Sequence, residues 1–308
     1  MRIAVIDLGT NTCNLLVAET TNTGFKILHQ SKQLVRLGDD KIRKNEISPE
    51  ATKRVLESFQ IHNTIIQKYN VGKIEVIATS AVRTAENKIE FLEKLSEQSG
   101  WIVKVITGEK EAELIFRGVL LAIEKFERPS VILDIGGGSN ELILGDKKEW
   151  LWKESQPTGM ARVINRFSLS DPIQKGEVKM LQDYFTEAHK NAFTKCKEKK
   201  VKTLIGCSGA FDTIADIIDS VNPGEKQRRT QLINLEEFYE VYETLVESTR
   251  EERLTMKGMD FVRVDLIVPA VILIEQLVSE IGIKQIIQTD FALREGVLFE
   301  YLLPGSDL

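Results

Sequence analysis

Residues 131–145 read VILDIGGGSNELILG, and the rest of the chain is interpreted from this stretch outward. An apolar, β-branched run reaches Asp134, three glycines follow, and a second apolar run closes the stretch, which is the pattern of strand, tight turn and strand. Glycines let backbone N–H groups approach a phosphate closely, and a carboxylate beside such a turn suits a divalent cation that bridges to phosphate oxygens. The stretch predicts a phosphate-binding hairpin, although a glycine-rich hairpin with a buried Asp is as often structural.

An internal repeat favours the functional interpretation. Residues 3–18, IAVIDLGTNTCNLLVA, follow the same pattern in the same register, with Asp7 in the place of Asp134 at an offset of 134 − 7 = 127. At that offset, EVIATSAVR from Glu75 aligns with KTLIGCSGA from Lys202. We expect two versions of one α/β unit, each with a hairpin turn that could face a shared cleft. By analogy, this is the plan of actin-like, sugar-kinase and Hsp70-like folds, and fold alone does not fix function.

Composition and charge limit the classes of protein. A chain of 308 residues with 42% hydrophobic and 28% charged residues suits two globular domains of ordinary size. Three cysteines and three histidines, all scattered, favour neither a disulfide framework nor a histidine-based metal centre. A net charge of −5 draws the protein neither to nucleic acid nor to an anionic membrane. The N-terminus enters a strand without a signal-peptide pattern, and Pro269 interrupts the most apolar run, so we expect a cytoplasmic protein.

The remaining pattern predicts alternating strands and helices. A strand at 24–37 precedes a helix that begins at Pro49 and is capped by Ser48. The second half repeats the order of the first. The other expected elements are a strand at 74–79, a turn at 80–83, helices at 85–98 and 109–126, helical pattern over 172–199, a strand at 203–206, a helix to 218, an exposed loop at 222–229, two helical stretches within 235–281, a strand at 286–289 and a closing helix at 291–302.

Six blocks in order over nearly the full length resemble the exopolyphosphatase and guanosine pentaphosphate phosphohydrolase family: AVIDLGTNTCNLL, ATSAVRTAEN, ITGEKEAELIFRGV, DIGGGSNEL, IGCSGAFDTIA and DFALREGVLFEYL. The resemblance implies an α/β fold of two ribonuclease-H-like domains of the actin-like ATPase superfamily, with mixed sheets and a cleft between them. We place the first domain at 1–124 together with a C-terminal helix at 291–308, and the second at 125–290. The chain looks like the short, two-domain form of the family.

The chain departs from the family pattern at its glycine-rich turns. The family's Gly-Gly-Gly-Ser-Thr-Glu has Asn140 in the Thr place, and its Gly-Ser-Asn-Ser reads Gly-Thr-Asn-Thr at 9–12. The turn at 206–210 reads Gly-Cys-Ser-Gly-Ala, where a fuller Gly/Thr pattern is common. These changes leave the carboxylates intact and bear on substrate preference more than on activity.

The resemblance places the catalytic base at Glu111, in the first turn of the helix that follows 107–108. Acidic residues are favoured at any helix N-terminus, so the pattern alone leaves a structural role open. Asp134 and Glu141, on opposite arms of one hairpin, are the expected catalytic pair that holds the metal and positions water. A carboxylate that caps turn N–H groups is the alternative for Asp134, and an exposed strand residue is the alternative for Glu141. Asp7 either shares the ion or only braces its own loop.

Three turns are expected to offer backbone or hydroxyl donors to phosphate oxygens, with ordinary turn chemistry as the alternative. Their residues are Gly9, Thr10, Asn11, Gly136, Gly137, Gly138, Ser139, Ser208 and Gly209. Arg83, in the TSAVR block, is the candidate for a bidentate phosphate clamp. Arg294 and Glu295 are interpreted as an internal ion pair. Arg228-Arg229 is interpreted as part of a solvated loop rather than a guide for a polyanion.

Together these expectations describe an exopolyphosphatase that releases terminal orthophosphate from inorganic polyphosphate by metal-assisted attack of water activated by Glu111. Guanosine pentaphosphate is the alternative substrate. A kinase of the same superfamily and a non-catalytic sensor of polyphosphate or nucleotide are the alternatives of other classes. The expected cofactor is Mg²⁺, with Mn²⁺ as a substitute and a monovalent cation such as K⁺ as a further candidate. No nucleic-acid or membrane partner is expected, and a homodimer is left open.

Overall fold

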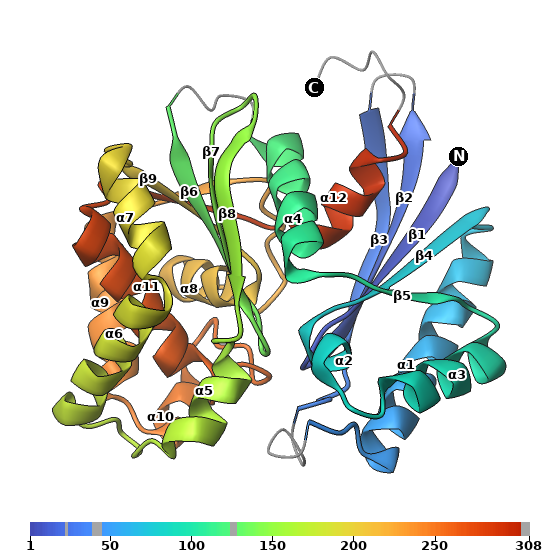
Figure 1. The fold of residues 1–308 in the computed structure, drawn as a ribbon, viewed down its shortest axis with the longest axis horizontal. Coiled ribbons are helices and arrows are strands. Elements are labelled where there is room, and N and C mark those ends of the chain that lie inside the picture. Colours follow the sequence, from blue (N-terminus) through green and yellow to red (C-terminus); the bar gives the residue numbers. More distant parts are fainter. Residues whose placement is uncertain (22–23, 39–44, 124–127, 303–308) are drawn as a thin grey trace. The chain divides into compact units, whose positions relative to one another are not determined.

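The computed structural model describes residues 1–21, 24–38, 45–123 and 128–302. The chain divides into two compact units, which are Met1–Leu121 with Leu293–Leu308 (unit 1) and Ala122–Ala292 (unit 2) (Figure 1). The predicted domain division at residue 124 falls outside the described residues and stays a prediction. Within the described ranges, no helix combines the length and the apolar character that crossing a membrane requires.

Unit 1 contains a five-stranded mixed sheet in the order β3-β2-β1-β4-β5. The first three strands form antiparallel hairpins, whereas β4 and β5 run parallel to β1. Short turns suffice for the hairpins, and the parallel strands need helical crossovers. The strands are β1 (Arg2–Leu8), β2 (Thr12–Thr21), β3 (Gly24–Leu34), β4 (Lys73–Ala78) and β5 (Val103–Val105).

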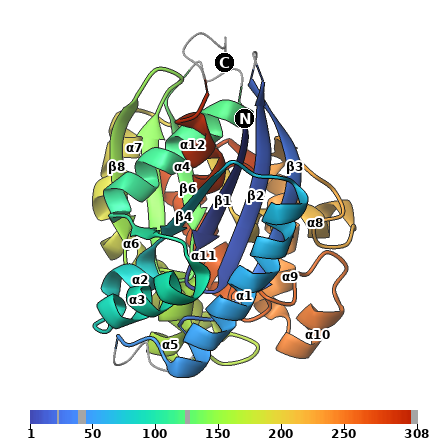
Figure 2. The same ribbon diagram turned by 90° about the vertical axis from the view of Figure 1, so that its right-hand side faces the viewer.

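Helices complete unit 1, and one face of its sheet is covered by α1 and α3 (Figure 2). Ser48 caps α1 as predicted, because its Oγ accepts a hydrogen bond from the N–H of Ala51 at 3.1 Å. The C-terminal helix α12 packs on β1 and comes so close to α4 that a Cβ on Gly296 would lie 1.7 Å from the carbonyl oxygen of Leu114. The helices are α1 (Pro49–Lys68), α2 (Ser80–Thr84), α3 (Lys88–Ser99), α4 (Gly108–Ala122) and α12 (Leu293–Phe299).

Unit 2 repeats this plan and adds one edge strand. Its sheet has the order β10-β11-β9-β6-β7-β8, with β6, β7 and β8 antiparallel and β9 and β11 parallel to β6. The strands are β6 (Ser130–Ile135), β7 (Asn140–Gly145), β8 (Trp150–Gln156), β9 (Thr203–Cys207), β10 (Gln231–Ile233) and β11 (Gln285–Thr289). The predicted α/β class with two ribonuclease-H-like mixed sheets is confirmed.

The core of unit 2 lies between one face of its sheet and a layer of helices in which α11 is central (Figure 1). Its apolar residues include Leu133, Phe185, Phe211 and Ile272, all buried. The helices are α5 (Met160–Phe167), α6 (Lys175–Ala188), α7 (Lys190–Glu198), α8 (Gly209–Asp219), α9 (Leu235–Glu247), α10 (Arg250–Thr255) and α11 (Ile267–Ile281).

The hairpin register confirms the internal repeat at the offset of 127. Asp7 pairs with Asn14 across β1 and β2, and Asp134 pairs with Glu141 across β6 and β7. The alignment of the second block at the same offset is wrong. Asp7 lies opposite Ile77, whereas Asp134 lies opposite Cys207, and these two partners are 207 − 77 = 130 residues apart. The connection between hairpin and parallel strand is therefore three residues longer in unit 2.

Several element predictions need correction. Residues 80–83, expected as a turn, begin the short helix α2, and α5 and β10 were not predicted. The helical pattern over 172–199 is two helices that meet at His189, which ends α6 and precedes α7. These features are short, so hydrophobic periodicity carries little signal for them. The predicted end of the helix near residue 126 lies outside the described residues.

Candidate active site

The glycine-rich turn of unit 2 is held closed by one backbone hydrogen bond. The N–H of Gly136 donates to the carbonyl oxygen of Ser139 at 3.0 Å. A Cβ on Gly136 would lie 2.7 Å from that same oxygen, so a residue with a side chain at position 136 would prevent this hydrogen bond from forming. Glycine at 136 is therefore required by close approach, which is the reason that the hairpin can be so tight.

Three successive carbonyl groups of this turn bind the start of α5. The carbonyl of Gly136 accepts from Met160 N at 3.0 Å, that of Gly137 from Ala161 N at 2.9 Å, and that of Gly138 from Arg162 Nε at 2.9 Å. In a trans peptide, a carbonyl and the following N–H point in opposite directions. The N–H groups of residues 137, 138 and 139 are therefore directed away from α5, and successive N–H groups arranged in this way form an anion-binding nest.

Asp134 and Glu141 lie opposite each other on β6 and β7, beside this turn. They are 8% and 1% exposed, so both carboxyl groups are removed from bulk water. Glu141 Oε1 accepts from Ser155 Oγ at 2.6 Å, and Asp134 Oδ1 accepts from the hydroxyl of Ser208. Burying acidic groups without partners is costly, and these hydroxyl donors offset part of that cost.

Ser208 was predicted as a phosphate donor, and the structure instead gives its hydroxyl to Asp134. The residue has φ 69°, a left-handed conformation that side chains rarely adopt, at the junction between β9 and α8. Local backbone strain of this kind clusters at functional sites. The hydrogen bond from Ser208 connects the third predicted turn to the same carboxylate that lies beside the glycine-rich turn.

The matching turn of unit 1 has the same hydrogen bond, from Gly9 N to the carbonyl of Thr12 at 2.9 Å. Asp7, the residue before the last one of β1, lies beside this turn and accepts from Asn14 Nδ2 at 3.2 Å. Burial raises the pKa of Asp7 to about 6, while the hydrogen bond from Asn14 acts in the opposite direction. Asp7 thus occupies the place of Asp134 but has an amide, not a carboxylate, as its cross-strand partner.

Backbone contacts also fix the rest of the unit 1 turn. The carbonyl of Asn11 accepts from Val35 N at 2.9 Å and from Arg36 N at 3.0 Å, and the carbonyl of Thr10 accepts from Leu37 N at 2.7 Å. The segment after β3 is therefore attached to the predicted phosphate loop. The exposed Arg36 lies next to this loop, and sequence reasoning did not single it out.

Glu111 and Arg83, predicted separately as base and phosphate clamp, form an ion pair in unit 1. Arg83 Nη1 lies 2.8 Å from Glu111 Oε2 and donates to the carbonyl of Ile106 at 3.0 Å. Glu111 is 8% exposed and lies in the first turn of α4, whereas Arg83 lies in the last turn of α2. The guanidinium thus orients the carboxylate through an ion pair that two separate helices provide.

Arg263 is a basic residue that sequence reasoning missed. A Cβ on Gly209 would lie 1.6 Å from Arg263 Nη2, so the guanidinium rests directly on Gly209 at the start of α8. Asp260 Oδ2 lies 3.9 Å from its Nε, and the side chain is 22% exposed. The signal in the sequence is only the glycine at 209, since residues 209 and 263 are far apart in the chain.

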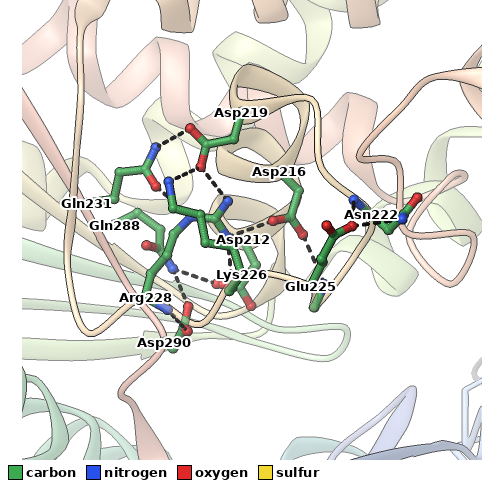
Figure 3. Close-up of polar contacts among 11 residues, drawn as sticks. Asp212, Asp216, Asp219, Asn222, Glu225, Lys226, Arg228, Gln231, Gln288 and Asp290 are labelled. Atoms are coloured by element: carbon green, nitrogen blue, oxygen red, sulfur yellow. Dashed lines mark hydrogen bonds and ion pairs between the residues drawn. The ribbon is translucent and has the colours of Figure 1, made fainter.

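Arg228, by contrast, cannot guide a polyanion, and its expected place in a solvated loop is also wrong. Its side chain is 3% exposed and lies between Asp216 at 2.6 Å and Asp219 at 2.7 Å (Figure 3). Its backbone N–H donates to Asp290 Oδ2 at 2.6 Å, and its Nε donates to Gln231. The charge of Arg228 is neutralised inside unit 2. The predicted ion pair of Arg294 with Glu295 is present at 3.7 Å.

A hard divalent cation fits the donors of unit 2. Among the described residues, no group of three or more His, Cys, Asp or Glu side chains is arranged to hold a metal ion. Mg²⁺ does not require such a cage, because it is usually held by one or two carboxylates together with water and substrate phosphates. The neighbouring oxygen donors of Asp134 and Glu141 suit Mg²⁺ or Mn²⁺ rather than a soft metal.

Each unit thus brings part of the predicted set together. Unit 1 joins Glu111 to Arg83 and places Asp7 beside the 9–12 turn. Unit 2 joins Asp134, Glu141 and Ser208 to the glycine-rich turn. The class defined by these features is an α/β protein with two similar units, each of which has a carboxylate beside a glycine-containing hairpin turn.

The chain belongs to the Ppx/GppA phosphatase family, which it matches over residues 16–304. This confirms the expected family and the expected class of hydrolase. The crystal structure of an exopolyphosphatase from Cytophaga hutchinsonii has a TM-score of 0.92 and 35% sequence identity, and the match covers 98% of this chain and 99% of that chain. Exopolyphosphatase 2 from Mycobacterium tuberculosis is 27% identical over 310 residues, with 96% of this chain and 97% of the relative covered.

A structure of the Aquifex aeolicus Ppx-GppA enzyme has a TM-score of 0.83 at 24% identity, and the match covers 97% of this chain and 99% of that chain. At this level of identity the likeness shows the shared fold. Both units of this chain therefore have the architecture of the family.

Proposed function

We propose that this protein is an exopolyphosphatase that releases terminal orthophosphate from inorganic polyphosphate. The observation that carries the proposal is the glycine-rich turn of unit 2, whose three bound carbonyl groups direct three successive N–H groups away from α5. A row of N–H groups next to two buried carboxylates suits a phosphate with an associated divalent cation. Two relatives that are named exopolyphosphatase, one of them 35% identical, support the same activity.

The reaction breaks one phosphoanhydride bond. Water attacks the terminal phosphorus, the bond from that phosphorus to the bridging oxygen breaks, and the shortened chain leaves with the electron pair. One proton of the attacking water passes to a carboxylate, which acts as general base. We assign this role to Glu111, whose carboxylate is held by the Arg83 guanidinium.

Unit 2 supplies the electrostatic part of the reaction. The N–H groups of residues 137–139 would bind phosphate oxygens, where preorganised donors stabilise developing charge. Asp134 and Glu141 would hold Mg²⁺ or Mn²⁺, which when bound neutralises phosphate charge. The hydroxyl groups of Ser208 and Ser155 keep these two carboxylates in place.

Arg83 has a second part in this scheme. Both of its hydrogen bonds to described residues use Nη1, and we assign Nη2 and Nε to the substrate. A planar guanidinium can bind two acceptors along different edges, which a lysine cannot do. The predicted bidentate clamp therefore becomes a residue that orients the base with one edge and binds phosphate with another.

The test is phosphate release from tripolyphosphate, long-chain polyphosphate, guanosine pentaphosphate and ATP, with Mg²⁺ and at equal concentration of phosphate chains. The proposal expects release from both polyphosphates at a kcat/KM above that for the two nucleotides. Higher kcat/KM for guanosine pentaphosphate would instead make this protein a guanosine pentaphosphate phosphohydrolase. No release from either polyphosphate would refute the proposal.

A further inference from the structure

A chain of buried polar contacts lies behind the glycine-rich turn of unit 2. It begins at Asn140, which is 0% exposed and immediately precedes Glu141. The Nδ2 group of Asn140 donates to the carbonyl of Thr158 at 2.7 Å and to Thr158 Oγ1 at 3.0 Å. The NH₂ group of an amide has two hydrogens to donate, so Asn140 binds both the backbone and the side chain of Thr158 through one nitrogen.

His189 continues the chain on the other side of Thr158. It lies at the junction of α6 and α7 with 0% exposure, and its Nε2 is 3.1 Å from Thr158 Oγ1. Its Nδ1 is 2.9 Å from Glu154 Oε1. An ionised carboxylate only accepts hydrogen bonds, so Nδ1 carries a hydrogen, and in the neutral imidazole Nε2 then accepts from the hydroxyl of Thr158. That hydroxyl oxygen in turn accepts from Asn140, so each link has one donor and one acceptor.

Thr158 is followed by the segment that orients the turn. A Cβ on the next residue, Gly159, would lie 2.4–2.5 Å from backbone atoms of Gly137 and Gly138, so the two backbones are in direct contact. Residues 160–162 then bind the three carbonyl groups of the turn. A displacement of Thr158 would therefore change the direction of the N–H groups that we assign to phosphate.

The backbone groups of His189 at the junction of α6 and α7 are paired without help from the imidazole ring. The N–H of His189 donates to the carbonyl of Phe185 at 2.9 Å, and its carbonyl accepts from Phe193 N at 3.0 Å. An apolar ring would pack beside Phe193, whose ring centre lies 6.2 Å away, without the cost of burying polar nitrogens. The two polar contacts of the ring serve Glu154 and Thr158, and Thr158 is the one that adjoins the glycine-rich turn.

We propose that His189 is a positioning residue for the phosphate turn and acts through Thr158. The inference rests on the proposed function, since it concerns the same turn. Residues that orient metal ligands typically change activity by about 10–100-fold when they are removed, and we expect the lower end of this range for a residue that orients the phosphate turn. His189 therefore contributes to catalysis without contact with the substrate.

The experiment compares wild type with His189→Asn, Thr158→Val, their double variant and Thr158→Ser. His189→Asn keeps a short donor towards Glu154 but is too short to reach Thr158, and Thr158→Val removes the hydroxyl at similar volume. Each single variant should lower kcat for tripolyphosphate about tenfold, in the range expected for such residues. The double variant should lose no more than Thr158→Val alone, because that change already removes the hydroxyl through which His189 acts. Thr158→Ser should restore the wild-type kcat.

Thermal unfolding, followed in all five proteins, separates positioning from stability. A merely structural role would lower the Tm and leave kcat unchanged at a temperature where the protein is folded. Unchanged kcat in both single variants would overturn the proposal, and so would multiplicative losses of about a hundredfold in the double variant.

A second measurement follows the conformation of the glycine-rich turn directly and does not depend on catalytic activity. The backbone amide signals of Gly137 and Gly138, observed by NMR with and without tripolyphosphate, should shift in Thr158→Val and His189→Asn and return in Thr158→Ser. Amide signals identical to wild type in both single variants would overturn the positioning role. An inactive wild type would instead refute the proposed function, while these signals still decide the role of His189.

Discussion

Gly159→Ala tests whether the glycine-rich turn of unit 2 does what its geometry indicates. Gly159 has φ −62° and ψ 153°, a conformation that alanine adopts readily, so any effect of the substitution comes from space and not from backbone strain. The added Cβ would lie 2.4 Å from the carbonyl carbon of Gly137 and 2.5 Å from that of Gly138.

The size of the effect follows from these distances. Ordinary contact begins at 3.4 Å, so the two backbones must separate by about 3.4 − 2.4 = 1.0 Å. Overpacking of this kind typically costs about 1–3 kcal/mol of stability, which leaves most domains folded. A misplacement of about 1 Å in a group that positions substrate can cost about 100-fold in rate. We therefore expect a folded variant with phosphate release lowered about 100-fold.

The assay is phosphate release from tripolyphosphate with Mg²⁺, alongside urea unfolding of the same preparation. Gly176→Ala is the matched control, because a Cβ at that exposed helical position meets nothing within 4 Å. It should keep wild-type activity and gain about 0.5–1 kcal/mol of stability, since alanine is the better helix former. Wild-type activity in folded Gly159→Ala would refute the assignment of the turn to phosphate binding.

Three further outcomes follow from single contacts in unit 2. Arg228→Ala leaves Asp216 and Asp219 without their buried cation, so urea unfolding should show a loss of about 3–5 kcal/mol, and an unchanged midpoint would contradict the account. Arg263→Gln removes the charge that rests on the start of α8. Steady-state kinetics should show a raised KM for tripolyphosphate with the Tm preserved, and an unchanged KM would exclude Arg263 from substrate binding. Burial and the nearby carboxylate of Asp212 on α8 raise the pKa of Asp290 from 3.8 to about 6. Because the folded state binds this proton more tightly than the unfolded state does, the free energy of unfolding falls as the pH rises from 3.8 to about 6. In Asp290→Asn this part of the decline in unfolding free energy should be absent, and the same slope in both proteins would contradict the assignment.

The two hairpins could be predicted from the sequence because their information is local. Continuous apolar runs, a carboxylate near the strand end and glycine in the turn are all read within fifteen residues. The offset that relates Asp7 to Asp134 also predicted two similar sheets, and the hairpin register agrees with it. Local chemistry was similarly sufficient for the Ser48 cap of α1.

The parts that could not be predicted depend on contacts between residues far apart in the chain. Glu111 and Arg83 were identified separately, but their ion pair is a consequence of how α2 and α4 pack. Arg228 was misplaced because a charged residue in a polar stretch is normally exposed, and only the folded unit shows the carboxylates that surround it. His189 had no signal at all, since its role depends on Thr158, which is 31 residues away.

The departure at position 140 has a clear structural consequence. Asn140 was expected to bear on substrate preference, and the structure shows an amide that binds both the backbone and the hydroxyl of Thr158. A threonine at this position has no NH₂ group and could not make both contacts through one nitrogen. Asparagine at position 140 therefore fits the segment at Thr158, which supports the glycine-rich turn in this chain.

The assignment of Glu111 as general base is tested by the rate of phosphate release by Glu111→Gln, with tripolyphosphate as substrate and Mg²⁺ present. Glutamine keeps the size of the side chain but cannot take a proton from water, so kcat should fall by about 100–10,000-fold. Glu109→Gln is the control, because Glu109 is an exposed carboxylate in the same first turn of α4 and should be dispensable. Release by Glu111→Gln at the rate of wild type would show that another group activates the water and would contradict the account.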